Sequence, residues 1–150
     1  MAKRRKGTRP KARAFVLDCS IAMAWFFRDE ADAYAEAVQD ALTKAEAIVP
    51  ATWPLEVVNT LVVGERRKRS TEAQATTWLS YLRTLPIVVD DETAMRAWGD
   101  TLSLARAHQL SAYDAAYLEL VLRRGLPLAT LDDKLKAAAT VVGVAEYKPS

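Results

Sequence analysis

The chain has 150 residues, of which 51% are hydrophobic and 27% are charged, a balance typical of one globular domain rather than of a disordered or fibrous protein. Cys19 is the only cysteine, which excludes a disulfide framework or a zinc ribbon within one chain and favours a reducing compartment. No apolar run reaches the roughly 18 uncharged residues that a transmembrane helix needs. We therefore expect a cytoplasmic protein with no membrane partner.

Positive charge is concentrated at the N-terminus. Residues 1–13 hold seven of the 21 lysines and arginines and no acid, so the remaining 14 basic residues stand against 19 acids and the rest of the chain has a net charge of −5. This segment lacks apolar periodicity and includes Gly7 and Pro10. We expect residues 1–13 to form a flexible basic arm before a domain at residues 14–147. The arm is either a solvated tail or a phosphate-binding segment, since mobile cations bring a polyanion to an acidic body.

Short β-branched runs alternate with longer helical patterns along the chain. In order, the predicted elements are a strand at 14–17, helices at 20–27 and 30–46, a strand at 47–49, helices at 53–68 and 71–84, a strand at 86–89, helices at 92–108 and 111–124, a strand at 127–129, a helix at 132–138 and a weak strand at 141–144. This alternation is typical of an α/β fold with a parallel sheet. We expect three layers, α/β/α, with helices on both faces of a short sheet of four to five strands. Gly125 is expected to close the helix before it.

Four acids stand where predicted strands end or the next helices begin. Asp18 ends the first strand, Asp132 ends the fourth, Glu56 lies in the first turn of the helix after the second strand, and Asp114 lies in the first turn of the helix that Ser111 opens. Right-handed crossovers bring such positions to one edge of a parallel sheet, where ligands bind. We therefore expect the four carboxylates to converge.

Each acid also has a purely structural interpretation. Asp18 and Asp132 suit helix N-caps, Glu56 suits a helix N-terminus, and Asp114 suits a capping box with Ser111. Capping does not explain why carboxylates gather at one edge, because clustered carboxylates repel one another unless a cation is present. An all-oxygen ligand set selects Mg²⁺ or Mn²⁺, which polarise a phosphoryl oxygen and activate water. The pattern predicts a metal-dependent nuclease.

The segments around these acids resemble one family. They read VLDCS at 16–20, VP at 49–50 followed by PLEV at 54–57, LSAYDAAY at 110–117 and LATLD at 128–132. In this order they are similar to the acidic motifs of PIN-domain ribonucleases, above all the VapC-type toxins of bacterial toxin–antitoxin pairs, over about residues 14–146. The resemblance implies a PIN-like fold and an endoribonuclease that uses Mg²⁺ or Mn²⁺.

The resemblance also implies roles for individual residues. It makes Asp18 and Asp114 direct metal ligands, Glu56 a ligand or a water-positioning acid, and Asp132 the fourth acid. Asp133 follows directly, so either acid of this pair could face the metal, and we favour Asp132 because it comes straight after Thr130 and Leu131. Ser20 matches a position that supports the first acid and equally fits a helix N-cap. The basic arm is longer than the family's usual start and lies outside the resemblance.

Protein and RNA partners follow from the same patterns. The helices at 71–84 and 92–108 carry more apolar mass than a thin sheet needs, in Trp78, Tyr81, Leu82, Met95 and Trp98, and the family pairs its subunits, so we expect a homodimer. The resemblance also implies a cognate antitoxin, which we expect over an apolar groove near Trp25, with one basic side chain reaching the acids. RNA phosphates could also meet Arg66 to Arg69, although a solvated helix end is the simpler interpretation.

Two other functions fit a strand that ends in an acid. A haloacid-dehalogenase-type phosphatase needs a second Asp two positions after the first, where Ser20 stands. A non-catalytic, receiver-like domain that binds Mg²⁺ and a partner needs a Lys at a late strand end, and residues 130–132 offer none. The sequence therefore favours a metal-dependent ribonuclease, for which the resemblance implies the role of a toxin.

Overall fold

The computed structural model describes residues 13–150 and is built around a four-stranded parallel sheet in the order β3-β2-β1-β4. The strands are β1 (Arg13–Leu17), β2 (Ala45–Val49), β3 (Ile87–Val89) and β4 (Leu128–Ala129). β1 and β2 read as nearly unbroken apolar runs, as expected for strands covered on both faces. Apart from Arg13, which begins β1, the predicted basic arm lies outside the described residues.

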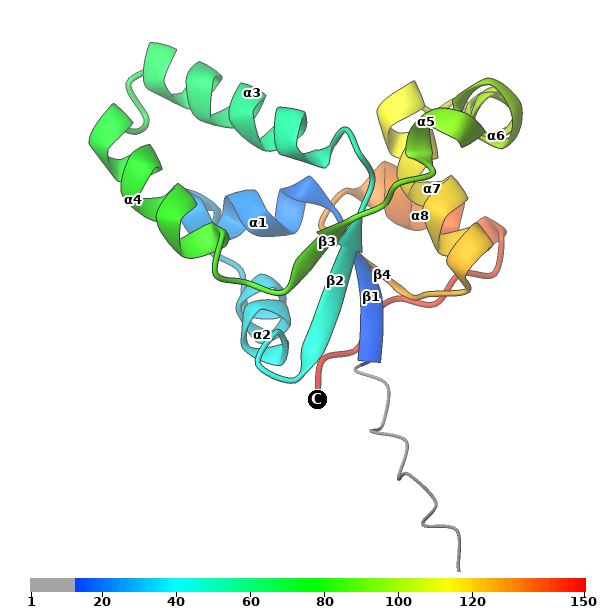
Figure 1. Ribbon diagram of the computed structural model, residues 1–150, viewed down its shortest axis with the longest axis horizontal. Coiled ribbons are helices and arrows are strands. Elements are labelled where there is room, and N and C mark those ends of the chain that lie inside the picture. The colour runs from blue at the N-terminus through cyan, green and yellow to red at the C-terminus, as the bar shows by residue number, and fades with distance from the viewer. Residues whose placement is uncertain (1–12) are drawn as a thin grey trace, which may run out of the picture.

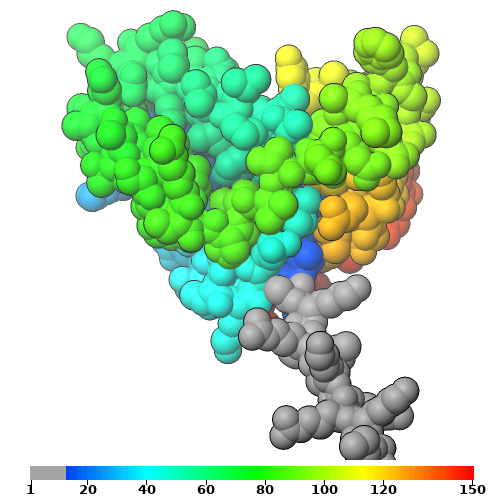
Figure 2. Space-filling model, viewed as in Figure 1, coloured from blue at the N-terminus to red at the C-terminus, as the bar shows by residue number. Residues whose placement is uncertain are grey.

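Eight α-helices are assigned within residues 13–150. They are α1 (Cys19–Phe26), α2 (Ala33–Ala41), α3 (Trp53–Arg66), α4 (Glu72–Leu82), α5 (Thr93–Arg96), α6 (Leu102–His108), α7 (Ala112–Arg124) and α8 (Asp133–Val141). In Figure 1, α1 to α4 lie on one side of the sheet and α5 to α8 on the other, which gives the three predicted layers. Figure 2 shows a hollow between the part formed by α3 and α4 and the part formed by α5 and α6. None of the helices within the described residues is long and apolar enough to cross a bilayer.

Two predicted helices are divided in the structure. The pattern at 30–46 is interrupted because Asp32 starts a new helix, its side chain accepting the N–H of Ala35 at 3.0 Å. A short 3₁₀ helix, η1 (Arg28–Glu30), precedes this cap. The pattern at 92–108 folds as α5, a π-helix named η2 (Ala97–Thr101), and α6 in succession.

The predicted fifth strand at 141–144 is wrong. Helix α8 continues to Val141, and the chain then turns through Gly143, whose φ is +78°. Only an isolated bridge between Leu128 and Glu146 follows. The β-branched residues at 141–144 therefore finish a helix and a turn, and the sheet has four strands.

Helix α7 is the central support of the acid-bearing edge. Seven consecutive residues, 115–121, are buried, so the helix is covered on all sides. Gly125 ends it with a φ of +62°, as predicted. On the other side of the sheet α3 crosses α1 closely, because a Cβ at Gly64 would lie 2.9 Å from the Phe27 ring. These contacts fix the helices whose first turns carry Asp114 and Glu56.

Candidate metal centre

Asp18 connects β1 to α1, and its carboxylate is held by two hydroxyls. It occupies the N-cap position, but its side chain makes no capping bond. Instead, Ser20 Oγ and Thr130 Oγ1 donate to Asp18 Oδ2 at 2.6 and 2.7 Å. Both bonds go to the same oxygen, which leaves Oδ1 free of hydroxyl partners. Asp18 is only 5% exposed, so the capping interpretation does not apply to it.

The two hydroxyls also join the chain after β4 to Asp18. Ser20 Oγ accepts the N–H of Leu131 at 3.0 Å, and Thr130 Oγ1 accepts the N–H of Asp132 at 3.0 Å. Ser20 is the second residue of α1 and is therefore not its N-cap. Ser20 Oγ therefore bonds both the carboxylate of Asp18 and the backbone after β4.

Glu56 lies in the first turn of α3 and accepts a hydrogen bond from Tyr117. The hydroxyl of Tyr117 donates to Glu56 Oε1 at 3.1 Å and accepts the N–H of Cys19 at 3.2 Å. Tyr117 is completely buried, and burial raises its pKa, so the hydroxyl keeps the proton that it donates. Thr52 Oγ1 lies 3.5 Å from the same Glu56 oxygen. One tyrosine thus joins the acid-bearing ends of α1, α3 and α7.

Asp114 and Asp132 combine local capping with access to the site. Ser111 Oγ accepts the N–H of Asp114 at 3.2 Å, as in a capping box. The reciprocal bond from the N–H of Ser111 is not among those of the described residues. Asp132 does cap α8, because its Oδ1 accepts the N–H of Leu135 at 2.8 Å, while its second oxygen makes no such bond. Asp132 therefore caps α8 with one of its two carboxylate oxygens. At Asp114 only one of the two hydrogen bonds of a capping box is present in the described residues.

Burial and neighbouring charges raise the pKa of three of the predicted acids, Asp18, Glu56 and Asp114. Burial raises the pKa of Asp18, Ser20 and Thr130 partly offset this, and the charge of Asp132 raises it again. Burial raises the pKa of Glu56 to about 7, with Asp18 and Asp114 adding to the rise and Tyr117 opposing it. Burial, Asp132 and Asp18 raise the pKa of Asp114. Of the adjacent acids at 132–133, it is Asp132 whose charge raises the pKa of both Asp18 and Asp114.

A second acidic group, after β3, provides a contrast. The carboxylate oxygens of Asp90, Asp91 and Glu92 lie within 4.8 Å of one another, a closer grouping than any three of the predicted acids form in the described residues. Arg123 donates to Asp90 Oδ2 at 2.7 Å and to Glu92 Oε2 at 3.1 Å. These bonds and one from Thr93 outweigh burial and lower the pKa of Asp90. The charge of this group is thus already balanced by an arginine.

None of the four predicted acids forms an ion pair within residues 13–150. Their carboxylates supply hard oxygen donors whose mutual repulsion a divalent cation relieves, which is the donor set that Mg²⁺ and Mn²⁺ prefer. The residues therefore fit a Mg²⁺ or Mn²⁺ ion.

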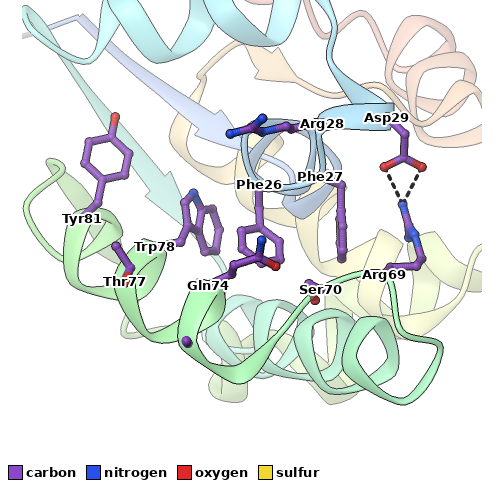
Figure 3. A pocket seen from close by; sticks show the side chains of 11 residues that line it. Phe26, Phe27, Arg28, Asp29, Arg69, Ser70, Gln74, Thr77, Trp78 and Tyr81 are labelled. Carbon is purple, nitrogen blue, oxygen red and sulfur yellow. Dashed lines mark hydrogen bonds and ion pairs between the residues drawn. The ribbon is translucent and has the colours of Figure 1, made fainter.

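An apolar groove lies between α1 and α4, away from the four acids. Phe26, Phe27, Trp78 and Tyr81 contribute to its lining, and its volume is about 770 Å³ (Figure 3). Trp25, around which the groove was predicted, does not line it: this side chain is half-buried, and its Nε1 donates to the carbonyl of Ala35 at 2.7 Å. The groove is lined by Phe26 and Phe27, which follow Trp25 in the sequence, and not by Trp25 itself.

The five residues predicted to form a dimer surface do not lie on one surface. Trp78 packs on Phe26 at a centroid distance of 5.1 Å and belongs to the groove with Tyr81, while Leu82 is buried. Only Met95 and Trp98, which are 74% and 93% exposed, lie outside the groove as free apolar surface.

Comparison with known proteins agrees with this geometry. A family model described as "PIN domain" matches residues 15–141. Among solved structures, the crystal structure of PAE2754 from Pyrobaculum aerophilum is similar with a TM-score of 0.65 and 22% identity, over 90% of this chain and 84% of that chain. At this identity the likeness concerns the fold alone. No curated protein matches the chain in sequence.

Proposed function

Because the chain belongs to the PIN domain family, whose members are in general metal-dependent nucleases, we propose that it is an endoribonuclease that hydrolyses RNA phosphodiester bonds with Mg²⁺ or Mn²⁺. We further propose that it acts in the cytoplasm as the toxin of a toxin–antitoxin pair. The observation that carries the nuclease proposal is the group of four carboxylates without an ion-pair partner in the described residues. A receiver-like binding domain or a phosphatase would not need the charges of Glu56 and Asp114 within reach of Asp18.

The acids take different roles according to their surroundings. Asp18 and Asp114 would hold the ion, with Asp132 as the fourth acid. When bound, the ion polarises the phosphoryl oxygen and lowers the pKa of water. Glu56 would orient the attacking water and accept its proton, because Tyr117 fixes one of its oxygens at 3.1 Å. Ser20 and Thr130 keep Asp18 in one orientation through short hydrogen bonds.

A nuclease assay tests the proposal directly. Purified protein is incubated with mixed-sequence RNA in Mg²⁺ or Mn²⁺, with and without a chelator. Cleavage inside RNA chains that the chelator stops is the expected result. Intact RNA under all these conditions, or cleavage that survives the chelator, would contradict the proposal. The variants Asp132→Asn and Asp133→Asn form a matched pair, in which only the first should lose activity.

The apolar groove supports the proposal of an antitoxin partner. Asp29 lines both the groove and a second hollow of about 460 Å³, which Ser20 and Asp132 also line. Glu30 and Asp32 add further acids to that hollow. A partner with apolar side chains in the groove could therefore extend a basic side chain through acidic surroundings to Asp132. Arg69, which now pairs with Asp29 at 3.0 Å (Figure 3), marks the start of this path.

Three variants separate the antitoxin surface from the proposed homodimer surface. If a small open reading frame beside the gene encodes the antitoxin, its product should copurify with the wild-type chain and with Trp98→Ala but not with Trp78→Arg. Retention by Trp78→Arg would contradict the groove assignment. Light scattering should show a dimer for the wild type and a monomer for the Met95→Ala, Trp98→Ala double variant. A wild-type mass of 16.6 kDa at micromolar concentration would refute the dimer.

A further inference from the structure

A small apolar cavity opens beside the four acids. It has a volume of about 180 Å³ and lies between the start of α3, η2, α6 and the start of α7. Much of its wall is formed by the small side chains of Ala97, Ala105, Ala112 and Ala116. No basic residue lines it, so it does not suit a phosphate group. Its size and lining instead fit a flat, largely apolar group.

The cavity adjoins the candidate metal centre on two sides. Thr52 lines it, and the hydroxyl of Thr52 lies 3.5 Å from Glu56 Oε1. Tyr113 also lines it and directly precedes Asp114. Tyr113 is 58% exposed, so its ring can pack against a group that enters from solvent. A ligand in the cavity would therefore lie next to whatever the four acids bind.

Thr101 provides a polar group without a partner in this cavity. The residue is only 6% exposed and lines the cavity, yet its hydroxyl takes part in no hydrogen bond of the described residues and is not sealed from solvent. Thr93, on the same wall, differs: its hydroxyl donates to Asp90 Oδ2 at 2.9 Å and accepts the N–H of Ala51 at 3.0 Å. A nearly buried hydroxyl normally has a hydrogen-bond partner. The hydroxyl of Thr101 is therefore free to bond a ligand.

The backbone around Thr101 also departs from regular helix. Thr101 is the last residue of η2, the π-helix that joins α5 to α6. Single π-helical turns are rare and recur at functional sites. Here the π-helical turn carries both Ala97 and Thr101 on the cavity wall.

We propose, resting on the ribonuclease function proposed above, that this cavity binds a pyrimidine base of the RNA next to the phosphate that is cut. An apolar cavity of about 150 Å³ holds one benzene ring, so the space suits a single six-membered ring better than a purine. Unstacked RNA bases are bound by stacking on aromatic side chains and by hydrogen bonds to their edges. Tyr113 supplies the ring, and the Thr101 hydroxyl both donates and accepts, which suits uracil and cytosine alike.

Sequencing the ends of a cleaved random RNA pool tests this proposal. The wild type should show pyrimidines enriched at one position beside the cut. Thr101→Val, which replaces the hydroxyl with a methyl group of similar size, should reduce that enrichment about three- to ten-fold, the loss expected for one hydrogen bond. Ala105→Leu, which fills the cavity, should abolish it, whereas Ala107→Leu, at an exposed alanine of the same helix, should not. Unchanged enrichment in both cavity variants would overturn the proposal.

Titration with nucleosides tests the cavity without any cleavage. Uridine and cytidine contain no phosphate, so their binding does not depend on a metal ion. Their addition should shift the NMR signals of Tyr113 and Ala112, which both line the cavity, in the wild type more than adenosine does, and Thr101→Val and Ala105→Leu should reduce the shifts. Equal shifts with adenosine, or equal shifts in the variants, would refute the assignment. If the wild type cuts no RNA, the ribonuclease function fails while this titration still decides what the cavity binds.

Discussion

Millimolar Mn²⁺ should raise the melting temperature of the protein, because the cation relieves the repulsion among the four carboxylates. Burial already makes the charged form of these carboxylates unfavourable. A cation at 100 times its dissociation constant stabilises the state that binds it by about 2.7 kcal/mol. For a domain of this length, about 1 kcal/mol corresponds to roughly 2–4 °C, so the expected rise is about 5–10 °C. The pKa of Glu56 is raised to about 7, and a proton there competes with the metal. The rise should therefore be larger at pH 8 than at pH 6.

Differential scanning fluorimetry of three proteins decides where the cation binds. Asp91→Asn, in the group after β3, should keep the full rise, because Arg123 already balances Asp90 and Glu92. The Asp18→Asn, Asp114→Asn double variant should show none. A rise that persists in the double variant and disappears in Asp91→Asn would place the metal after β3 and refute the reasoning.

Three further predictions concern stability and RNA capture. In chelator, the free energy of unfolding should fall by about 1 kcal/mol from pH 6 to pH 8, because the folded-state pKa of Glu56, about 7, lies above its ordinary value of 4.5 and stability is lost as pH rises through the folded-state pKa. Urea titrations of Glu56→Gln should show a flatter dependence on pH, and an equal slope would contradict this. Gly64→Ala should destabilise by about 1–3 kcal/mol, since its Cβ meets the Phe27 ring at 2.9 Å; Gly99→Ala, with nothing within 4 Å, should not, and equal effects in thermal unfolding would refute the packing argument. Deleting residues 1–10 should flatten the slope of log K against log salt for RNA binding by about two to three units if Lys3 to Lys6 contact phosphates; an unchanged slope would leave capture to Arg66 to Arg69.

The positions of the acids could be predicted because each depends on local sequence. A buried strand that ends in Asp18, and helices that open at Ser111 and Asp132, are signals contained within a few residues. Parallel topology then determines which edge they share. Predicting the positions of the acids therefore required no knowledge of distant contacts.

The groups that hold the acids could not be predicted in the same way. Tyr117 contacts Glu56 and Cys19 across 61 and 98 residues of sequence, and Thr130 contacts Asp18 across 112. Tyr117 lies three residues after Asp114 on an apolar helix, where a tyrosine indicates only a core position. Its hydroxyl acquires a role only when three helices meet.

The errors at element boundaries also have physical causes. Asp32 and Ala45 divide a stretch whose composition suits one long helix, because a cap at Asp32 and pairing of Ala45 with Arg13 outweigh local propensity. The β-branched residues at 141–144 predicted a strand, but α8 extends to Val141 and the chain then turns at Gly143. The π-helix at η2 has no recognised local pattern.

Cleavage of mixed RNA by Asp114→Asn in Mg²⁺ tests the central claim most directly. The substitution keeps the backbone N–H that bonds Ser111 Oγ at 3.2 Å and removes one charge from the four acids. The rate should fall by about two orders of magnitude or more, with the metal-free melting temperature nearly unchanged, whereas Asp133→Asn should cut at the wild-type rate. A role in capping alone would lower stability by about 1 kcal/mol and leave the rate intact. Near wild-type cleavage by Asp114→Asn would therefore contradict a metal centre at these carboxylates.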